Sequence, residues 1–258
     1  DSDQAIASYI DVSKMSNNGT IAFAGSSGNV SVKNLDTTTK VGLGIAAADL
    51  SATLTLTLAD ETGTADAVTV VENDTLAVAS AITLKTTSIE TLNIEKSEEA
   101  SNNATTTFTF GDNAPSKIVV TKGHSGDALA LGTLNKTTTN VDASAAKMIL
   151  TGTAATDVDT TISAPGEVAN ILTLSGGADT VTIGKAATAI NILDGGSGTD
   201  TLNITLNNAA SDFTSISNFE VLNLTIAEST AVGFNHADKD DGLNDTDVKT
   251  INILGGNS

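Results

Sequence analysis

Short apolar segments alternate with turns rich in Gly, Asn, Asp and Ser, and beyond residue 117 their centres fall roughly every 10 residues. The segments read KIVV, ALAL, TNVDA, KMIL, DTTI, ILTL, TVTI, INIL and TLNI. Two segments and two turns make a unit of about 20 residues, which is typical of solenoids whose coils stack on one another. The spacing therefore predicts an all-β protein folded as a parallel β-solenoid, of the β-helix or β-roll kind.

The composition favours the same architecture. Aromatic residues make up only 3% of the 258 residues, and Trp is absent. Thr accounts for about one residue in six, and together with Val and Ile it favours extended backbone. A narrow solenoid core can be filled by small and β-branched side chains, so the shortage of large rings fits this fold.

The first 90 residues are less regular than the rest. TIAF, NVSV and SATLTLTLAD are predicted strands, ADETGTADAVTV is a predicted hairpin, and QAIASYIDVSKM is either a short helix or an entry strand. Charged residues and Asn interrupt the series of apolar segments in KSEEASNNATT, residues 96–106. We therefore divide the chain into residues 1–100, which either begin the solenoid or form a small β-domain, and residues 101–258, which form the regular solenoid. The chain starts at Asp1 and stops within LGGNS, so we expect it to be a fragment of a longer protein.

The formal charge of −19 restricts the partners of this chain. All 12 basic residues are Lys, so the basic surface that nucleic acids require is missing, and we expect neither nucleic-acid binding nor membrane insertion. Such a charge destabilises a compact fold through self-repulsion unless cations neutralise it. Two interpretations remain open, bound divalent cations or a solvated acidic surface. The absence of Cys excludes disulfides, and calcium is a common alternative source of rigidity.

One stretch carries metal-binding chemistry. GGSGTDTLN, residues 195–203, matches the nine-residue pattern G-G-x-G-x-D-x-U-x at every defined position. The glycines allow a tight loop, and Asp200 adds a carboxylate to it. A shortened copy, LSGGADTVTI, places Asp179 about one coil before Asp200. Calcium takes six to eight oxygen ligands, so we expect the two turns to stack and to bind it jointly.

Further acidic residues are expected on the same edge of the solenoid. TGTAATDVDTTI lies one coil earlier and NHADKDDGLNDTD one coil later, whereas the opposite turns are nearly free of acid. The later segment resembles an EF-hand loop, but Gly242 comes one place too early and no Glu follows, so an irregular calcium loop and a solvated loop remain open. The candidate calcium ligands are Asp157, Asp159, Gly176, Gly177, Asp179, Asp194, Gly195, Gly196, Gly198, Asp200, Asp238, Asp240, Asp241 and Asp245.

Asn recurs between apolar neighbours in a repeated phrase. SIETLNIE at 88–95 returns as SNFEVLNLT at 217–225, with shorter echoes elsewhere. Stacked coils allow such side chains to hydrogen-bond in a ladder, as in cross-β assemblies. The alternative is that each Asn occupies the solvent face independently. The Asn residues concerned are Asn93, Asn191, Asn203, Asn223 and Asn252.

At these motifs the chain resembles the RTX-type calcium-binding proteins that Gram-negative bacteria export. The IETLNI and NFEVLNL phrases, the high Thr and Asn content and the absence of Cys resemble its surface-layer (S-layer) members. The resemblance implies a calcium-stiffened solenoid, type I secretion to the cell surface and self-assembly into a two-dimensional lattice. It also implies attachment to cell-surface polysaccharide through regions outside this chain. The full motif occurs only once, which leaves an RTX adhesin or an exoprotein stalk open.

Two other classes compete with a structural role. Polysaccharide-active enzymes also use β-helices, but this chain has no Arg, no Trp and a single Tyr, and neither His124 nor His236 has a second His or a Cys nearby in the sequence. We therefore expect no enzymatic activity. An ice- or carbohydrate-binding module would present a flat array of outward Thr on one face, whereas the Thr runs DTTTK, ATTTFTF and KTTTN are expected mainly at turns.

Overall fold

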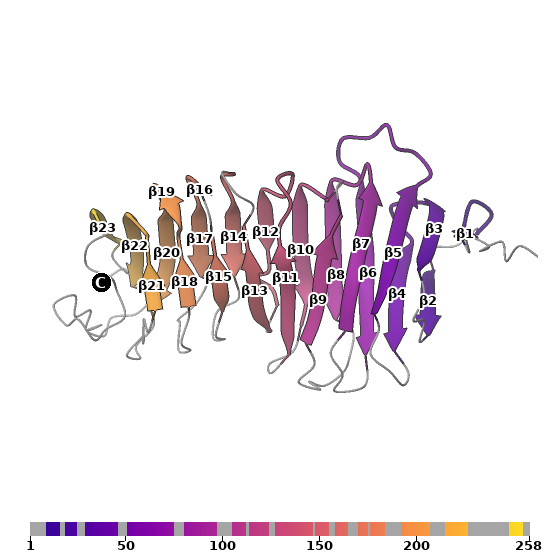
Figure 1. Ribbon diagram of the computed structural model, residues 1–258, viewed down its shortest axis with the longest axis horizontal. Coiled ribbons are helices and arrows are strands. Elements are labelled where there is room, and N and C mark those ends of the chain that lie inside the picture. The colour runs from indigo at the N-terminus through magenta and orange to yellow at the C-terminus, as the bar shows by residue number, and fades with distance from the viewer. Residues whose placement is uncertain are drawn as a thin grey trace, which may run out of the picture.

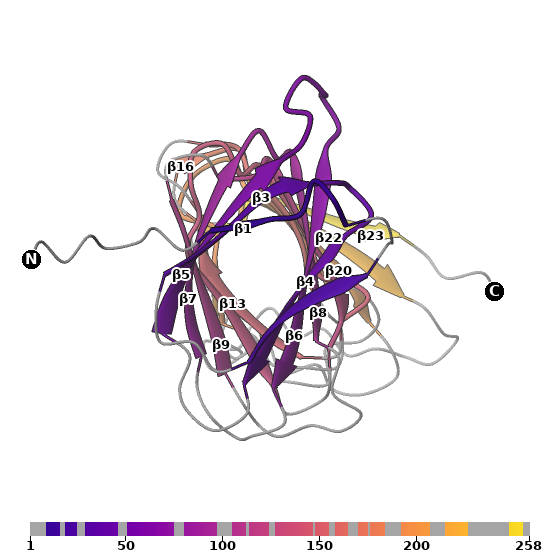
Figure 2. The ribbon, with the colours of Figure 1, turned by 90° about the vertical axis from the view of Figure 1, so that its right-hand side faces the viewer.

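The computed structural model is an elongated parallel β-solenoid without helices in the part that it describes (Figure 1). It describes residues 9–15, 19–24, 29–45, 51–74, 80–96, 105–111, 114–123, 127–146, 148–154, 158–164, 170–174, 176–183, 192–206, 215–226 and 248–254. Figure 2 looks along the long axis and shows two parallel sheets facing each other. The prediction of an all-β parallel solenoid is confirmed.

Strands of the two large sheets alternate along the chain, except that the last two described strands belong to the same sheet. Sheet 1 contains β1 (Tyr9–Asp11), β3 (Val30–Leu35), β5 (Ser51–Leu58), β7 (Ser80–Thr87), β9 (Thr105–Phe110), β11 (Ala128–Thr133), β13 (Ile149–Thr153), β15 (Ile171–Thr173), β18 (Ile192–Asp194) and β21 (Ser215–Ser217). Sheet 2 contains β2 (Thr20–Ala24), β4 (Lys40–Ile45), β6 (Ala67–Asp74), β8 (Thr91–Lys96), β10 (Lys117–Lys122), β12 (Asn140–Asp142), β14 (Thr161–Ala164), β17 (Thr180–Ile183), β20 (Thr201–Leu206), β22 (Val221–Ile226) and β23 (Thr250–Leu254). Within each large sheet a strand pairs with strands of the adjacent coils, so sequence neighbours in these two sheets lie in opposite sheets, apart from β22 and β23, which pair with each other.

The core is a set of columns of aliphatic side chains between the sheets. Along β8 the burial alternates strictly, with Leu92 and Ile94 facing inward. In-register pairing places Leu202 of β20 beside Val181 of β17 and Leu222 of β22, and all three are buried. Neighbouring side chains within a column lie one strand spacing apart, about 4.8 Å, and branched aliphatic residues fill this space.

The less regular N-terminal part joins the same two sheets. β7 pairs with β9, and β8 pairs with β10, so both sheets continue across residue 100. The predicted hairpin at residues 59–70 is wrong, because β5 and β6 belong to different sheets. The described part of QAIASYIDVSKM forms strand β1 rather than a helix. The division of the chain into residues 1–100 and 101–258 stays a prediction. In the described ranges no helix is long and apolar enough to cross a membrane.

A ladder of Asn side chains forms on the outer face of sheet 2 near its C-terminal end. Asn223 Nδ2 donates to Asn203 Oδ1 at 2.7 Å, and Asn252 Nδ2 donates to Asn223 Oδ1 at 2.7 Å. Asn93 lies outside this ladder, with its Nδ2 3.5 Å from Thr69 Oγ1. Asn191 lies outside the described residues. The predicted ladder is therefore confirmed for three of the five positions.

An ion pair lies inside the solenoid, a feature that the sequence pattern did not predict. Glu72 of β6 pairs in register with Lys96 of β8, and both side chains are only 1% exposed. The Lys96 Nζ lies 3.6 Å from Glu72 Oε2, and the Thr106 hydroxyl donates to Glu72 Oε1. Burial of two charges is tolerated when each has a partner, and removing one partner leaves an uncompensated charge in the core.

Glu72→Ala should therefore lower the free energy of unfolding by about 3–5 kcal/mol. The control is Glu95→Ala, which breaks the more exposed Lys40–Glu95 pair and should cost about 1 kcal/mol or less. Urea denaturation of both variants measures the difference. Equal losses of unfolding free energy in the two variants would contradict the expectation that the buried pair stabilises the fold more than the exposed pair.

Candidate metal centre

The two Gly-rich turns stack directly on each other. Their central residues form a small third sheet, in which β16 (Gly176–Gly177) pairs in parallel with β19 (Ser197–Gly198). Figure 1 shows both strands at one edge of the solenoid, where the chain passes from sheet 1 to sheet 2. The structure thus brings together the full motif and its shortened copy, as expected from their spacing.

The glycines allow this close approach between coils. A Cβ added to Gly198 would lie 1.7 Å from the carbonyl oxygen of Gly177, and one added to Gly195 would lie 2.0 Å from the carbonyl oxygen of Asn218. The φ angles of Gly177, Gly196 and Gly198 are +122°, +86° and +149°, a region that other residues rarely adopt. Only Gly at these positions therefore allows the turns to stack in this way.

Carboxylates just before successive strands of sheet 2 form a column along this edge. The backbone N–H of Thr160 donates to Asp179 Oδ1 at 2.6 Å, that of Asp179 to Asp200 Oδ1 at 2.8 Å, and that of Asp200 to Glu220 Oε2 at 2.7 Å. Each carboxylate thus accepts a hydrogen bond from the coil before its own. We call Asp179, Asp200 and Glu220 the acidic column.

Asp200 is the most constrained member of the acidic column. Its side chain is 0% exposed, and its second oxygen, Oδ2, is buried without a hydrogen-bond partner. The pKa of Asp200 is raised from 3.8 to about 6, chiefly because the carboxylate is buried. The Asp179 N–H acts in the opposite direction and lowers this pKa, and the neighbouring charges of Asp179, Glu220 and Asp194 contribute to raising it. A buried carboxylate oxygen surrounded by other carboxylates is a site that a cation would stabilise.

Two further predicted residues lie beside this column. Asp159 Oδ1 accepts a hydrogen bond from the N–H of Ala178 at 2.8 Å, which ties it to the turn of the following coil. Asp194 Oδ1 accepts from the N–H of Gly196 at 3.0 Å and from Asn218 Nδ2 at 2.7 Å. Asp157, Asp238, Asp240, Asp241 and Asp245 lie outside the described residues.

The donor set is compatible with calcium but is not a complete site by itself. Carboxylate oxygens and the carbonyls of Gly-rich turns are the hard ligands that calcium prefers. Within the ranges that the structure describes, no three His, Cys, Asp or Glu side chains converge closely enough to form a metal site. A calcium ion here would thus need backbone carbonyls or residues outside those ranges in addition to the acidic column.

Glu220 was missed as a candidate ligand, although the repeated phrase contained its signal. In SNFE, Asn218 has a left-handed φ of 58°, Phe219 is buried, and Glu220 accepts the Asp200 N–H. The same corner occurs in the phrase SIE, in which Ser88 has a φ of 54° and Ile89 is buried. There Glu90 Oε2 accepts the Asp66 N–H at 2.8 Å. The repeated phrase therefore encodes a turn and its carboxylate contact in addition to the recurring Asn.

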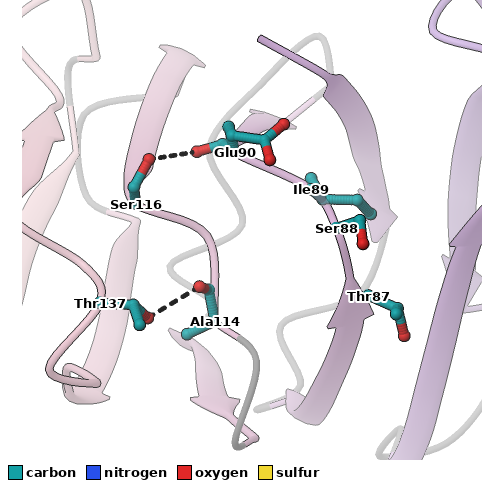
Figure 3. Close-up of a pocket in the computed structure, with 7 residues that line it drawn as sticks. All are labelled: Thr87, Ser88, Ile89, Glu90, Ala114, Ser116 and Thr137. Carbon is teal, nitrogen blue, oxygen red and sulfur yellow. Dashed lines mark hydrogen bonds between the residues drawn. The ribbon is translucent and has the colours of Figure 1, made fainter. Parts of the chain in front are cut away.

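A groove of about 310 Å³ lies next to this second corner, lined by Thr87, Ser88, Ile89, Glu90, Ala114, Ser116 and Thr137 (Figure 3). The hydroxyl of Ser116 donates to the carbonyl of Glu90 at 3.0 Å, and that of Thr137 donates to the carbonyl of Ala114 at 2.8 Å. These hydroxyls hold neighbouring coils together. The polar groups of this groove are therefore explained by the stacking of the coils.

Comparisons with protein-family models, curated proteins and solved structures give no match for this chain. Function is therefore inferred from the geometry of the acidic column and from the resemblance of its turns to RTX repeats.

The raised pKa of Asp200 predicts a pH dependence in metal-free protein. Because the folded pKa of about 6 exceeds the ordinary 3.8, its contribution to stability is present below about pH 4 and is lost as the pH rises through 6. The free energy of unfolding should fall by about 2 kcal/mol more in the native protein than in Asp200→Asn, which cannot titrate. Urea denaturation with chelator between pH 4 and 7 measures this. Parallel stability curves for the two proteins would contradict the assignment.

Proposed function

We propose that this chain is a structural segment of an RTX-type S-layer protein that binds calcium and self-assembles on a bacterial cell surface. The observation that carries the proposal is the buried, unpartnered Oδ2 of Asp200 within a column of stacked carboxylates. The stacking of the G-G-x-G-x-D turn on its shortened copy at the same edge supports the RTX assignment. In this proposal the protein is extracellular, is exported by type I secretion and has no enzymatic activity.

The residues that would hold calcium are those that the turns bring together. Asp200 would contribute the oxygen that has no protein partner, and Asp179, Asp194 and Glu220 surround it closely enough to affect its pKa. Calcium would supply positive charge and directional bonds to oxygen ligands. The glycines contribute by allowing the turns to lie close enough for residues of two coils to share an ion.

Assembly follows from the same electrostatic argument. A chain with a formal charge of −19 repels its own copies over about one Debye length, roughly 8–10 Å at moderate ionic strength. Divalent ions that share ligands between subunits would remove this repulsion and add specific contacts. Sodium would only screen the charge. Attachment to cell-surface polysaccharide would use regions outside this chain.

A binding module is the second candidate, and one observation favours it. Thr53 and Thr57 of β5 pair in register with Thr83 and Thr87 of β7 on the outer face of sheet 1. Of the Thr runs expected at turns, Thr105–Thr107 instead lie within β9, where Thr107 adds to the outer face. That part of the expectation is wrong, and a flat Thr array suits adhesion to ice or carbohydrate.

Calcium should stabilise this protein through Asp200. We expect millimolar calcium to raise the melting temperature of the native protein by several degrees and that of Asp200→Asn by much less, since the variant lacks one ligand charge. Asp127→Asn is the matched control, because Asp127 is also fully buried and precedes a strand of sheet 1. Thermal melting with calcium and with chelator measures the effect. Identical melts of the native protein in both conditions would remove the support for calcium binding.

Calcium should also control self-association of the full-length protein. Light scattering or electron microscopy across a calcium titration should show ordered sheets, whereas sodium chloride at matched ionic strength should leave the protein dispersed. A full-length protein that stays monomeric at saturating calcium would contradict the S-layer proposal. The binding module with the outward Thr array would then be the better account.

A further inference from the structure

The buried pair of Glu72 and Lys96 places an amine beside a carboxyl group in the core. Each side chain is only 1% exposed. Because β6 and β8 pair in register at this position, the two side chains occupy one inner column, one coil apart. The next inward residues on the two strands, Val70 and Ile94, are buried and apolar. The register of the strands therefore holds the two groups together in surroundings of low polarity.

Low polarity changes the chemistry that such a pair can undergo. In water the ammonium and the carboxylate are stable ions, and an ammonium nitrogen has no lone pair with which to attack carbon. Burial penalises both charges, so the transfer of one proton from Lys96 Nζ to Glu72 Oε2 costs less in the core than in solvent. The transfer gives a neutral amine, which is a nucleophile, next to a neutral carboxylic acid. The pair therefore contains both reactants of an amide bond.

Thr106 supplies a hydrogen-bond donor to the same carboxyl group. It lies in β9 of the opposite sheet, is 1% exposed, and its hydroxyl donates to Glu72 Oε1. Attack on a carboxyl carbon places negative charge on one of its oxygens, and a fixed donor stabilises that charge. The other oxygen, Oε2, lies 3.6 Å from Lys96 Nζ. The two oxygens are thus distinguished, with Oε1 placed to hold charge and Oε2 placed to receive protons from the amine.

We propose that Lys96 and Glu72 condense to an intramolecular amide once the chain has folded. After the proton transfer, the Nζ lone pair attacks Glu72 Cδ, and negative charge forms on Oε1 beside the Thr106 hydroxyl. A second proton passes from Nζ to Oε2, the Cδ–Oε2 bond breaks, and water leaves as the double bond to Oε1 re-forms. One C–N bond replaces one C–O bond, so the step requires neither an oxidant nor a reductant.

The amide is favoured because it removes both charges from the core. A buried ion pair retains a desolvation penalty that a neutral amide lacks. The folded chain also holds the reactants together, so folding has already met the entropic cost of bringing them into contact. The bond joins the coil of β6 covalently to the coil of β8, in a chain that has no Cys for a disulfide. This inference is independent of calcium and of the proposed self-assembly.

Mass spectrometry of the folded native chain tests the bond. The intact protein should be lighter than its sequence mass by one water molecule. Trypsin should not cleave after Lys96, because its amine is acylated, and digestion should release residues 41–85 joined to residues 86–117. Fragment ions should place the link between Glu72 and Lys96. Separate recovery of residues 41–85 and residues 86–96 from the folded protein would overturn the inference.

The pair Lys40–Glu95 is the matched control within the same molecule. Its Nζ–Oε2 distance of 2.8 Å is shorter, but its side chains are 43% and 18% exposed. Water stabilises both ions there, so we expect no bond, and trypsin should cleave after Lys40. An amide at this exposed pair as well would contradict the argument that burial drives the reaction.

Two variants separate the amide from other losses of water. The apolar replacement Glu72→Leu, Lys96→Met keeps the core filled and should retain its full sequence mass. For chains collected in urea during cell-free synthesis and then refolded, Thr106→Val should slow the loss of water by about ten-fold or more. A loss of water that persists in the double variant would overturn the amide. So would a link at Glu72 that hydroxylamine cleaves, because that reactivity identifies an ester to Thr106.

Discussion

Each residue of a parallel solenoid lies about 4.8 Å from its counterparts in the coils on either side, so every side chain is repeated against a near copy of itself. Aliphatic residues satisfy this requirement easily and form the inner columns of the two sheets. Asn satisfies it by donating to the next Asn, as Asn252, Asn223 and Asn203 do. Carboxylates do not, because stacked negative charges repel. The edge where carboxylates stack is therefore the one place where this repetition is unfavourable, and it is where we propose that calcium binds.

The backbone resolves part of that conflict. Asp179, Asp200 and Glu220 each turn one oxygen toward an N–H of the preceding coil, which satisfies both groups without cancelling the charge. The Asp200 Oδ2 remains buried and unpartnered, and the raised pKa of Asp200 expresses the cost of ionising it there. Glu72 and Lys96 show the other solution, in which a buried carboxylate meets an ammonium group from the next coil. A cation would play the part of that ammonium in the acidic column.

The periodic features of this fold could be predicted from the sequence, and the non-periodic ones could not. Strand positions beyond residue 117, the stacked turns and the contact between the Asp179 and Asp200 coils follow from spacing alone, because equal spacing places residues in register. The assignment of β5 and β6 to opposite sheets was missed, since a Gly-containing loop between two apolar runs also fits a hairpin. Glu220 was missed although the repeated phrase that contains Glu90 carried its signal. The Glu72–Lys96 pair was missed because the first 90 residues are too irregular for the register of their strands to be predicted from the sequence. A single acidic residue in one phrase does not reveal which backbone or side chain it will meet.

In the proposed function, calcium acts at one edge of the solenoid rather than on the chain as a whole. Hydrogen exchange measured by mass spectrometry, with calcium and with chelator, locates the effect coil by coil. We predict that calcium slows exchange in peptides covering residues 176–206, and that peptides from β5 and β7 change little. Uniform protection of all coils, or protection confined to β5 and β7, would contradict the assignment of the acidic column as the calcium site.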